Sequence, residues 1–348
     1  MDVFDYADEL EYGELHLKAD PETGLRAIVA IHDLRRGPAI GGCRFLEYDT
    51  SDDAIRDAMR LGRGMTYKAA IADLPHGGAK SVLIRPPEMT DQQRYEMFRS
   101  FGSYVDSLGG DYITAEDSGT NVADMNTIGE ETEHVLGRET EEGGSGDPSP
   151  ATATGVRRGI EAAVRYKYGR GSLDGLTVAI QGVGHVGYPL AEQLDERGVD
   201  LVVTDVDDHA VERCVSEFGA RAVGTDEIFD VDCDIFAPCA LGAVLNDETI
   251  PRLGCDIVAG SANNQLADQR HDVQLRERDI LYAPDYLINS GGLIYVAAYY
   301  ADSAVDSVDE KIEGIYETML QIFDRADTDD EPTGLVTDRI AEERLAAS

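Results

Sequence analysis

The segment TVAIQGVGHVGYPLAE, residues 177–192, constrains the fold of this 348-residue chain more than any other. TVAIQ is typical of a buried strand and PLAE of a helix, and between them Gly182, Gly184 and Gly187 follow the pattern GxGxxG. In such a unit the glycines permit a tight turn, a close approach of a pyrophosphate, and close packing of helix on strand. The pyrophosphate lies at the N-terminus of the helix, where free N–H groups favour an anion. We expect the whole loop to bind a dinucleotide: Gly182, Val183, Gly184, His185, Val186 and Gly187.

Asp205 indicates which dinucleotide this loop binds. It ends the apolar run LVVTD, eighteen positions after Gly187. A carboxylate at this point bonds the adenosine ribose hydroxyls and repels a 2′-phosphate. The following VDDH adds negative charge and contains no arginine. The sequence therefore predicts NAD rather than NADP.

The first part of the chain has a different rhythm from the rest. Residues 12–31 read as a hairpin, and 81–86 and 112–117 as further short strands. A helix is expected to begin at Ser51, where acidic residues occupy the first turn and apolar residues recur at helical spacing. We therefore predict an α+β substrate domain over residues 1–140.

The second part alternates short apolar strands with helices. This rhythm predicts an α/β doubly wound parallel sheet, a Rossmann domain over residues 141–326, with helices on both faces. Residues 137–155 are rich in Gly, Ser and Pro and are expected to form the hinge. The segment 311–326 predicts one closing amphipathic helix, and 327–348 is expected to pack back on the first domain.

The charge balance excludes several classes of partner. The chain has 68 Asp and Glu against 30 Lys and Arg, a formal net charge of -38 spread over both halves. Such a field repels nucleic-acid phosphates and anionic membranes, so we expect neither as a partner. An acid-rich, lysine-poor composition resembles that of proteins from salt-loving cells.

Cysteine usage and hydropathy point to a reducing, aqueous compartment. The five cysteines form no CxxC pair and have no close histidine, so we expect buried thiols and no metal site. No apolar run approaches the roughly 18 residues that suggest a membrane span. The acidic N-terminus lacks the basic and apolar regions of a secretory signal. We therefore expect a cytoplasmic protein.

Two of only five lysines lie twelve residues apart in GMTYKAAIADLPHGGAK. Lysine is rarely buried unless it is paired or employed, and the surroundings of Lys68 and Lys80 look apolar and tight. One ammonium could hold a substrate carboxylate, while the other, desolvated beside a like charge, could act as a general base. The glycines at 77 and 78 would let substrate or backbone come close to Lys80. Asp117, at the end of YITAED, could exchange protons with a substrate. Together with a nicotinamide site, these groups suggest oxidation of a carbon that bears an amine and a carboxylate.

Several further motifs carry a family resemblance. They are GPAIGGCRF (37–45), TAEDSGT (114–120), DPSPATATGV (147–156), APCALGAVLND (237–247), AGSANNQLAD (259–268) and YAPDYLINSGGLIYVA (282–297). With the lysine segment and the glycine loop, they resemble the leucine, phenylalanine and valine dehydrogenases of the glutamate dehydrogenase superfamily, and the run from 237 onwards looks closest to leucine dehydrogenases.

The resemblance implies reversible, NAD-dependent oxidative deamination of an L-amino acid to a 2-oxo acid and ammonium, in a cleft that closes between two domains. It implies that Lys68 binds the substrate carboxylate, that Lys80 is the catalytic base, that Asp117 relays a proton and that Asn289 contacts the amine. It also implies a homo-oligomer. It assigns further residues to the cofactor: Ser149, Thr152, Ala240, Ala262 and Asn264.

The resemblance also bears on which amino acid is the substrate. Glutamate dehydrogenases carry a lysine where this chain has Ile40, next to Gly41 in the substrate site. Burying an unpaired carboxylate against isoleucine would cost several kcal/mol, which excludes glutamate as the main substrate. Leu293 and Val296 are expected to form the other walls of an apolar pocket for a branched side chain.

Two alternatives remain open: a phenylalanine dehydrogenase, and a catalytically silent NAD-binding regulator on the same fold. The retention of Lys68, Lys80 and Asp117 together speaks against the regulator. A hydroxy-acid dehydrogenase would need a histidine base with an arginine for the carboxylate, and no histidine stands in such an arrangement.

The composition predicts that the protein is more stable in concentrated salt. Repulsion among the surface acids is screened when the Debye length falls to about 3 Å at 1 M salt. Thermal unfolding followed across salt concentration should give a midpoint that rises from dilute to molar salt. Equal stability at both ends of the series would contradict the prediction.

Overall fold

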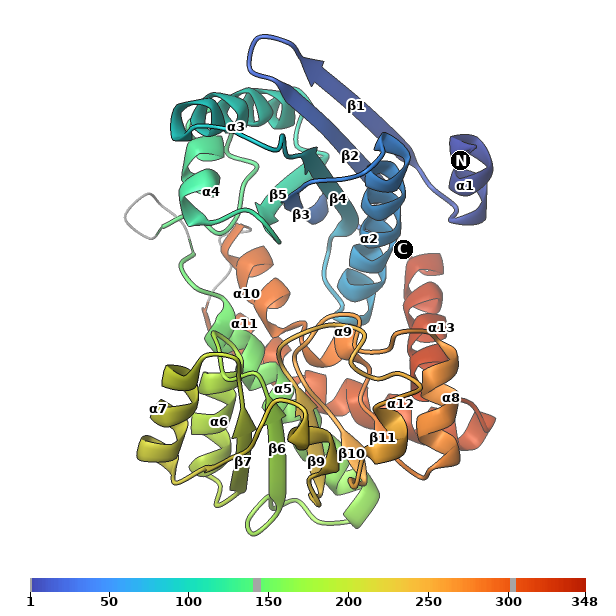
Figure 1. Cartoon of the computed structure of the whole chain (residues 1–348). Coiled ribbons are helices and arrows are strands. Elements are labelled where there is room, and N and C mark those ends of the chain that lie inside the picture. Colours follow the sequence, from blue (N-terminus) through green and yellow to red (C-terminus); the bar gives the residue numbers. More distant parts are fainter. Residues whose placement is uncertain (1, 140–144, 301–304) are drawn as a thin grey trace. The chain divides into compact units, whose positions relative to one another are not determined.

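The computed structural model describes residues 2–139, 145–300 and 305–348. The chain divides into two compact units (Figure 1). Unit 1 comprises Met1–Asp147, Tyr299–Ala301 and Ala341–Ser348, and unit 2 comprises Pro148–Ala298 and Asp302–Ile340. The predicted limit between residues 140 and 141, and the middle of the predicted hinge, lie outside the described residues. Of the C-terminal segment 327–348, only the last eight residues group with unit 1.

Unit 1 is an α+β domain around a five-stranded sheet of order β1-β2-β4-β3-β5. Its elements are α1 (Val3–Glu9), β1 (Glu14–Asp20), β2 (Leu25–Asp33), β3 (Ala39–Leu46), α2 (Ser51–Ile71), β4 (Gly77–Ile84), α3 (Asp91–Asp106), β5 (Tyr112–Glu116) and α4 (Val122–Gly129). Strand β2 is antiparallel to β1 and β4, whereas β3 is parallel to β4 and β5. The predicted hairpin and both further strands are confirmed.

Helices cover both faces of this sheet. Alternate residues of β2 face opposite sides, so Ile28 packs with α2 and Val29 packs with α3 and α4. Helix α2 starts as predicted at Ser51, with the Thr50 side chain accepting a hydrogen bond from the backbone N–H of Asp53. It continues without a break to Ile71, so Lys68 lies in its last turn. The lysine pair is thus divided between a helix and a strand.

Unit 2 contains a six-stranded parallel sheet of order β11-β10-β9-β6-β7-β8. The elements from residue 149 onwards are α5 (Ser149–Tyr168), β6 (Thr177–Gln181), α6 (Gly187–Asp195), β7 (Asp200–Thr204), α7 (Asp208–Phe218), β8 (Arg221–Ala222), η2 (Glu227–Asp230), β9 (Ile235–Pro238), η3 (Ile250–Arg252), β10 (Ile257–Val258), α8 (Arg270–Glu277), β11 (Leu281–Tyr282), α9 (Asp285–Ile288), α10 (Gly291–Tyr300), α11 (Val305–Glu313), α12 (Ile315–Asp329) and α13 (Thr333–Ala346). Strands alternate with helices as the sequence indicates. The predicted fold class, an α+β domain followed by a Rossmann domain, is confirmed.

The prediction of one helix over 311–326 is wrong. Helix α11 ends at Glu313, and α12 begins at Ile315 after the helix cap Gly314. Glycine lacks a side chain that could restrict its backbone, so it is a poor residue for a helix interior. The apolar spacing on either side continues past this point, which explains why periodicity alone did not reveal the break.

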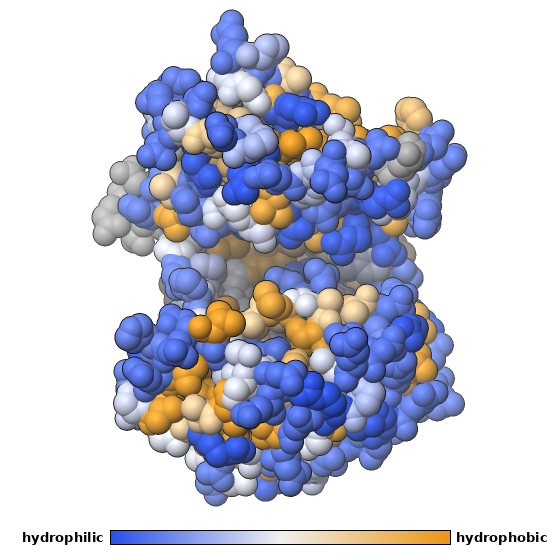
Figure 2. All heavy atoms as spheres, viewed as in Figure 1, coloured by the Kyte–Doolittle hydropathy of each residue, from blue (hydrophilic) through white to orange (hydrophobic). Residues whose placement is uncertain are grey.

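Hydrophilic side chains cover much of each unit on the face that Figure 2 shows, with smaller hydrophobic areas between them. This surface agrees with the excess of acidic residues in the sequence. Among the described residues, no helix combines the length and the apolar character needed to cross a membrane.

The C-terminal residues of unit 1 hold the end of α2. The guanidinium of Arg344 donates to the carbonyls of Ala70, at 3.2 Å, and Ile71. Close by, the hydroxyl of Tyr67 donates to the carboxylate of Glu342 at 2.8 Å. The last carbonyls of a helix have no partner inside the helix, so Arg344 satisfies groups that α2 itself leaves unpaired.

We predict that Arg344→Met lowers the free energy of unfolding by about 1–3 kcal/mol, because it leaves the carbonyl of Ile71 without a donor, whereas that of Ala70 still accepts from the backbone N–H of Asp73 at 3.1 Å. The matched control is Arg339→Met on the same helix, where a partly exposed arginine pairs with Asp329 and Glu331. Exposed ion pairs contribute about 1 kcal/mol or less. Urea unfolding at one salt concentration measures both variants. Equal losses would show that Arg344 contributes only a surface charge.

Candidate active site

Lys80 lies in the middle of β4, and only 6% of its side chain is exposed. Helix α2 packs directly over this strand, and a Cβ on Gly78 would lie 1.9 Å from the backbone nitrogen of Thr66. A Cβ on Gly77 would lie 1.8 Å from the carbonyl oxygen of Asp33. The two glycines before Lys80 therefore admit neighbouring backbone, which is one of the two roles that the sequence suggests for them.

Asp117 follows β5 and contacts the predicted base. Its Oδ2 lies 3.0 Å from Nζ of Lys80. Thr120 fixes the turn, because its hydroxyl accepts from the backbone N–H of Asp117 at 2.9 Å and contacts the Asp117 carbonyl at 2.8 Å. The structure thus brings together the two residues that the sequence assigns to catalysis.

Gly42 leaves the space in which this pair meets. A Cβ at this position would lie 2.8 Å from the Cβ of Asp117 and 3.0 Å from Nζ of Lys80. Its neighbour Gly41 serves strand packing, since a Cβ there would lie 1.8 Å from the carbonyl oxygen of Ala79. Side chains at either position would push the strand or the pair apart.

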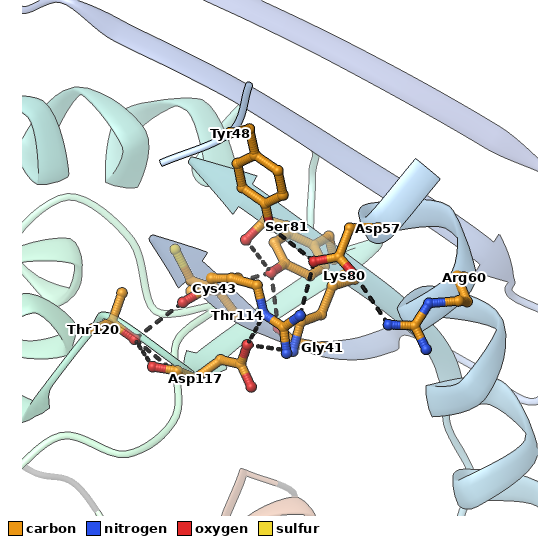
Figure 3. Close-up of polar contacts among 12 residues, drawn as sticks. Gly41, Cys43, Tyr48, Asp57, Arg60, Lys80, Ser81, Thr114, Asp117 and Thr120 are labelled. Carbon is orange, nitrogen blue, oxygen red and sulfur yellow. Dashed lines mark hydrogen bonds and ion pairs between the residues drawn. The ribbon is translucent and has the colours of Figure 1, made fainter. Parts of the chain in front are cut away.

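Arg44 is a member of this site that sequence reasoning missed. Figure 3 labels the two carboxylates that it contacts, Asp57 and Asp117. Its Nε donates to Oδ2 of Asp117 at 2.8 Å, the same oxygen that Lys80 contacts. Its Nη1 donates at 2.8 Å to Oδ2 of Asp57 on α2, which also accepts from the hydroxyl of Tyr48 at 2.8 Å. The arginine of the motif GPAIGGCRF was the available signal, but from sequence alone roles were assigned only to Ile40 and Gly41 of this motif.

Burial and neighbouring charges set the proton affinities of this site. Burial lowers the pKa of the Lys80 ammonium, Asp117 opposes this shift and Arg44 adds to it, so the pKa lies below the usual range. Burial alone would raise the pKa of the Asp117 carboxyl, but Lys80 and Arg44 together hold it below its usual value. A lysine that can lose its proton beside a carboxylate that stays charged is suited to general-base catalysis.

The other predicted substrate residues of unit 1 lie on the same elements. Ile40 and Gly41 belong to β3, and Ile40 is buried. Lys68 is partly exposed in the last turn of α2, so the expected tight packing holds for Lys80 and not for Lys68, and the surroundings of Lys80 include charged groups as well as apolar ones.

The predicted cofactor residues of unit 2 gather at one edge of its sheet. Gly182 follows β6, Asp205 follows β7, Ala240 lies shortly after β9 and Ala262 lies beyond β10. All four strands are parallel, so these residues lie at the carboxyl edge. Strand β6 pairs with β7 on one side and β9 on the other, so the order in which strands are added to the sheet reverses at β6, the point at which such folds bind nucleotides.

The glycine loop has the shape of a phosphate cradle. Gly182 has φ +94°, which side chains rarely adopt, and a Cβ there would lie 2.6 Å from the Cβ of Ala240. A Cβ on Gly187, the first residue of α6, would lie 1.9 Å from the carbonyl oxygen of Gly182. A Cβ on Gly184 would meet nothing within 4 Å, so the middle of the loop borders open space. This geometry agrees with the tight turn, open approach and close helix packing that a dinucleotide loop requires.

Asp205 is bound to the same loop. Its Oδ2 accepts from the backbone N–H of Val183 at 2.7 Å, and its Oδ1 accepts from that of Asp207 at 3.0 Å. A carboxylate has about four acceptor positions, so two such contacts leave capacity for ribose hydroxyls. These contacts fix the carboxylate where the adenosine half of a dinucleotide is expected.

Comparison with known proteins identifies the family. Residues 13–134 match the model described as "Glu/Leu/Phe/Val dehydrogenase, dimerisation domain". Residues 143–211 and 203–329 match "Glutamate/Leucine/Phenylalanine/Valine dehydrogenase". The chain belongs to this family. The resemblance inferred from the sequence motifs is confirmed, and the chain is an amino acid dehydrogenase.

Relatives of this dehydrogenase match it over nearly the whole chain. Leucine dehydrogenase of Thermoactinomyces intermedius is 50% identical over 99% of this chain and 94% of the relative. Leucine dehydrogenase of Bacillus subtilis (strain 168) is 48% identical over the same shares. The crystal structure of L-tryptophan dehydrogenase from Nostoc punctiforme has a TM-score of 0.88 and 40% identity, with 99% of both chains covered.

The remaining predicted residues of the dehydrogenase lie in unit 2. Asn289 is buried and its Nδ2 donates to the carbonyl of Ser261 at 3.0 Å and to Oδ1 of Asn263 at 2.9 Å. Leu293 and Val296 are buried on α10, three residues apart and so on one face of the helix. Others lie at the start of α5 or in the loop after β10: Ser149, Thr152, Ala262 and Asn264. The roles given to all these residues stay predictions.

Proposed function

We propose that this dehydrogenase oxidatively deaminates an apolar, branched-chain L-amino acid with NAD as the hydride acceptor. The reaction converts the amino acid, water and NAD to a 2-oxo acid, ammonium, NADH and a proton, and it is reversible. The observation that carries the proposal is the buried contact of Lys80 with Asp117, 3.0 Å between Nζ and Oδ2, in a chain of this family.

Lys80 supplies the base. In its neutral form it accepts a proton from the substrate nitrogen, so that the nitrogen lone pair can form a C=N bond as hydride leaves the α-carbon. Lys80 then passes this proton to solvent through Asp117, becomes neutral again, and takes a proton from the water that adds to this carbon. It returns that proton to the nitrogen. The C–N bond then breaks, the electron pair leaves with the nitrogen, and the hydroxyl proton is lost as the carbonyl forms and is taken up by the released ammonia to give ammonium. Asp117 stays within hydrogen-bond reach of Nζ throughout and relays the protons.

Lys68 and Asn289 position the substrate in this proposal. A substrate carboxylate pairs with the ammonium of Lys68, and the amine donates to the side-chain oxygen of Asn289. The amide hydrogens of Asn289 already bond Ser261 and Asn263, and an amine requires an acceptor, which the oxygen supplies.

The carboxyl edge of the unit 2 sheet is the proposed NAD site. The pyrophosphate binds at the glycine loop, Gly182 to Gly187, and the adenosine ribose binds Asp205. Residues assigned to the remainder of the cofactor are Ser149, Thr152, Ala240, Ala262 and Asn264. When bound, NAD accepts the hydride from the α-carbon.

Ile40, Gly41, Leu293 and Val296 are proposed to surround the substrate side chain. Ile40 is 2% exposed and offers no partner to a carboxylate, which supports the exclusion of glutamate. The relatives named leucine dehydrogenase support a branched-chain substrate. An aromatic amino acid is the second candidate, supported by the similarity to L-tryptophan dehydrogenase.

A homo-oligomer and a cytoplasmic location complete the proposal. The family model that matches residues 13–134 is described as a dimerisation domain, which supports self-association. The small amino acid, its 2-oxo acid and ammonium are the proposed partners besides NAD. Nucleic acid and membranes are not expected partners, because the net charge of -38 repels both phosphate backbones and anionic lipids.

Lys80→Ala should lower kcat/KM for leucine by about 10²–10⁴-fold, the usual contribution of a general base. NADH formation in concentrated salt measures this, with leucine, valine, phenylalanine and glutamate as parallel substrates. Lys18→Ala, an exposed lysine of the same unit, is the matched control and should retain full activity. Activity on glutamate alone, or an unchanged rate in Lys80→Ala, would contradict the proposed function.

Asp205→Asn should lower the preference for NAD over NADP by about tenfold or more. The amide keeps an acceptor for one of the two backbone N–H groups that Asp205 binds, and it removes the charge that repels a 2′-phosphate. The ratio of kcat/KM for the two cofactors measures the preference. Asp200→Asn, an exposed position at the other end of β7, makes the same change in net charge. An equal change in both variants would assign the effect to net charge rather than to a ribose contact.

A further inference from the structure

Arg44 stands at the centre of a chain of contacts that joins the base to helix α2. Oδ2 of Asp117 is shared by Nζ of Lys80, at 3.0 Å, and Nε of Arg44, at 2.8 Å. Nη1 of the same guanidinium lies 2.8 Å from Oδ2 of Asp57 on α2. Only 18% of the Arg44 side chain is exposed, so these contacts are largely shielded from water.

We propose that Arg44 is a positioning residue for the deamination reaction, which holds the carboxylate of Asp117 against Lys80 and ties both to helix α2. The inference rests on the proposed function, in which Lys80 is the base and Asp117 relays its protons. Arg44 has only donors and cannot accept the proton on Nζ of Lys80, so it acts through Asp117, whose Oδ2 both residues contact.

The shape of the arginine side chain suits this role. Its guanidinium is planar and holds its donors in a fixed fork, so Nε and Nη1 can meet two separate carboxylates at once. Lysine carries all its donors on one nitrogen, so it cannot span two carboxylates as the separated Nε and Nη1 of Arg44 do. With Oδ2 engaged twice, Oδ1 of Asp117 has no hydrogen-bond partner within the described residues. The carboxylate is therefore fixed by one oxygen and can exchange a proton through the other.

The contact with Asp57 connects the base to the helix that carries Lys68. Asp57 and Lys68 are eleven residues apart on α2, which is about three turns, so both lie on the same side of the helix. Asp57 is itself held by the hydroxyl of Tyr48 at 2.8 Å and by Arg60 at 3.1 Å. Arg44 thus links the residue proposed for proton transfer to the helix proposed for carboxylate binding.

Arg44 also adds a second cation close to the base. Arg44 and Cys43 on β3, and Asp117 after β5, lie close enough to Lys80 to influence its pKa. Helix α2 carries Asp57 and Lys68, and β2 carries His32, which is bound to Thr66 at 2.9 Å and to the carbonyl of Leu10 at 3.0 Å. Loss of the Arg44 charge removes a group that lowers the pKa of Lys80, so this pKa rises.

The test compares Arg44→Met and Arg44→Lys with the wild-type enzyme across pH. The rate constant kcat/KM falls as pH falls through the pKa of Lys80, because only the neutral amine is a base. Arg44→Met should move this acidic limb to higher pH by about one unit and lower kcat about tenfold or more, with KM for leucine changed little. Arg44→Lys should restore the limb, because it keeps the charge, but only part of kcat, because it cannot bridge Asp57 and Asp117.

Arg85→Met is the matched control. Arg85 follows β4 and pairs with Glu47 at 2.9 Å, beyond the far ends of the two strands that carry Lys80 and Arg44. Its pH profile and kcat should equal those of the wild type. NADH affinity, a property assigned to unit 2, should be unchanged in every variant and shows that each is folded.

A second measurement needs no catalysis. Labelling of Lys80 by an amine-reactive reagent, followed by peptide mass spectrometry, gives the pH of half-maximal reaction, and Lys80→Ala supplies the blank. This pH should rise in Arg44→Met and not in Arg85→Met. An unmoved acidic limb and labelling curve would overturn the inference, as would a large rise in KM at constant kcat, which would make Arg44 a substrate ligand. An inactive wild-type enzyme would instead contradict the proposed function, and labelling would still test the role of Arg44.

Discussion

A buried lysine amine beside a carboxylate is the interaction on which the rest of unit 1 depends. An ammonium without a partner in such a place would cost several kcal/mol, so Lys80 must be paired or neutral. Asp117 supplies the pair at 3.0 Å, but the same oxygen is also held by Arg44. The carboxylate is thus divided between two cations, which weakens its hold on the proton of Lys80. This arrangement allows Lys80 to be buried and still to act as a base.

Close backbone packing makes this arrangement possible. A Cβ on Gly42 would intrude between Lys80 and Asp117, and one on Gly78 would overlap the backbone of α2. Without Gly78, α2 could not lie this close to β4, and Asp57 on α2 would move away from Arg44. In unit 2, the glycine loop shows the same principle, because Gly187 brings α6 to within contact of the turn at Gly182. In both units, glycines permit the close backbone packing on which the arrangement of the site depends.

The sequence predicted those parts of the site that have a local or compositional signal. Lys80 was visible because lysine is scarce, and Gly182 because a strand and a helix flank it. Arg44 was missed because arginine is common in this chain. Its partner Asp57 becomes apparent only when the packing of α2 against the sheet is known. The break at Gly314 was missed because apolar spacing continues across it. What sequence could not supply was pairing between distant elements.

The acidic surface and the buried cluster obey different electrostatics. Charges exposed to water are screened once they lie farther apart than a Debye length, which is about 3 Å at 1 M salt. The contacts of Lys80 and Arg44 with Asp117 are no longer than 3.0 Å and are shielded by protein, so added salt has little effect on them. A net charge of -38 can therefore make the stability of the folded protein depend on salt, while the proton affinity of Lys80 is set by its neighbours. Because the surface charge and the proton affinity of Lys80 are set separately, a large number of surface acids is compatible with the chemistry at Lys80.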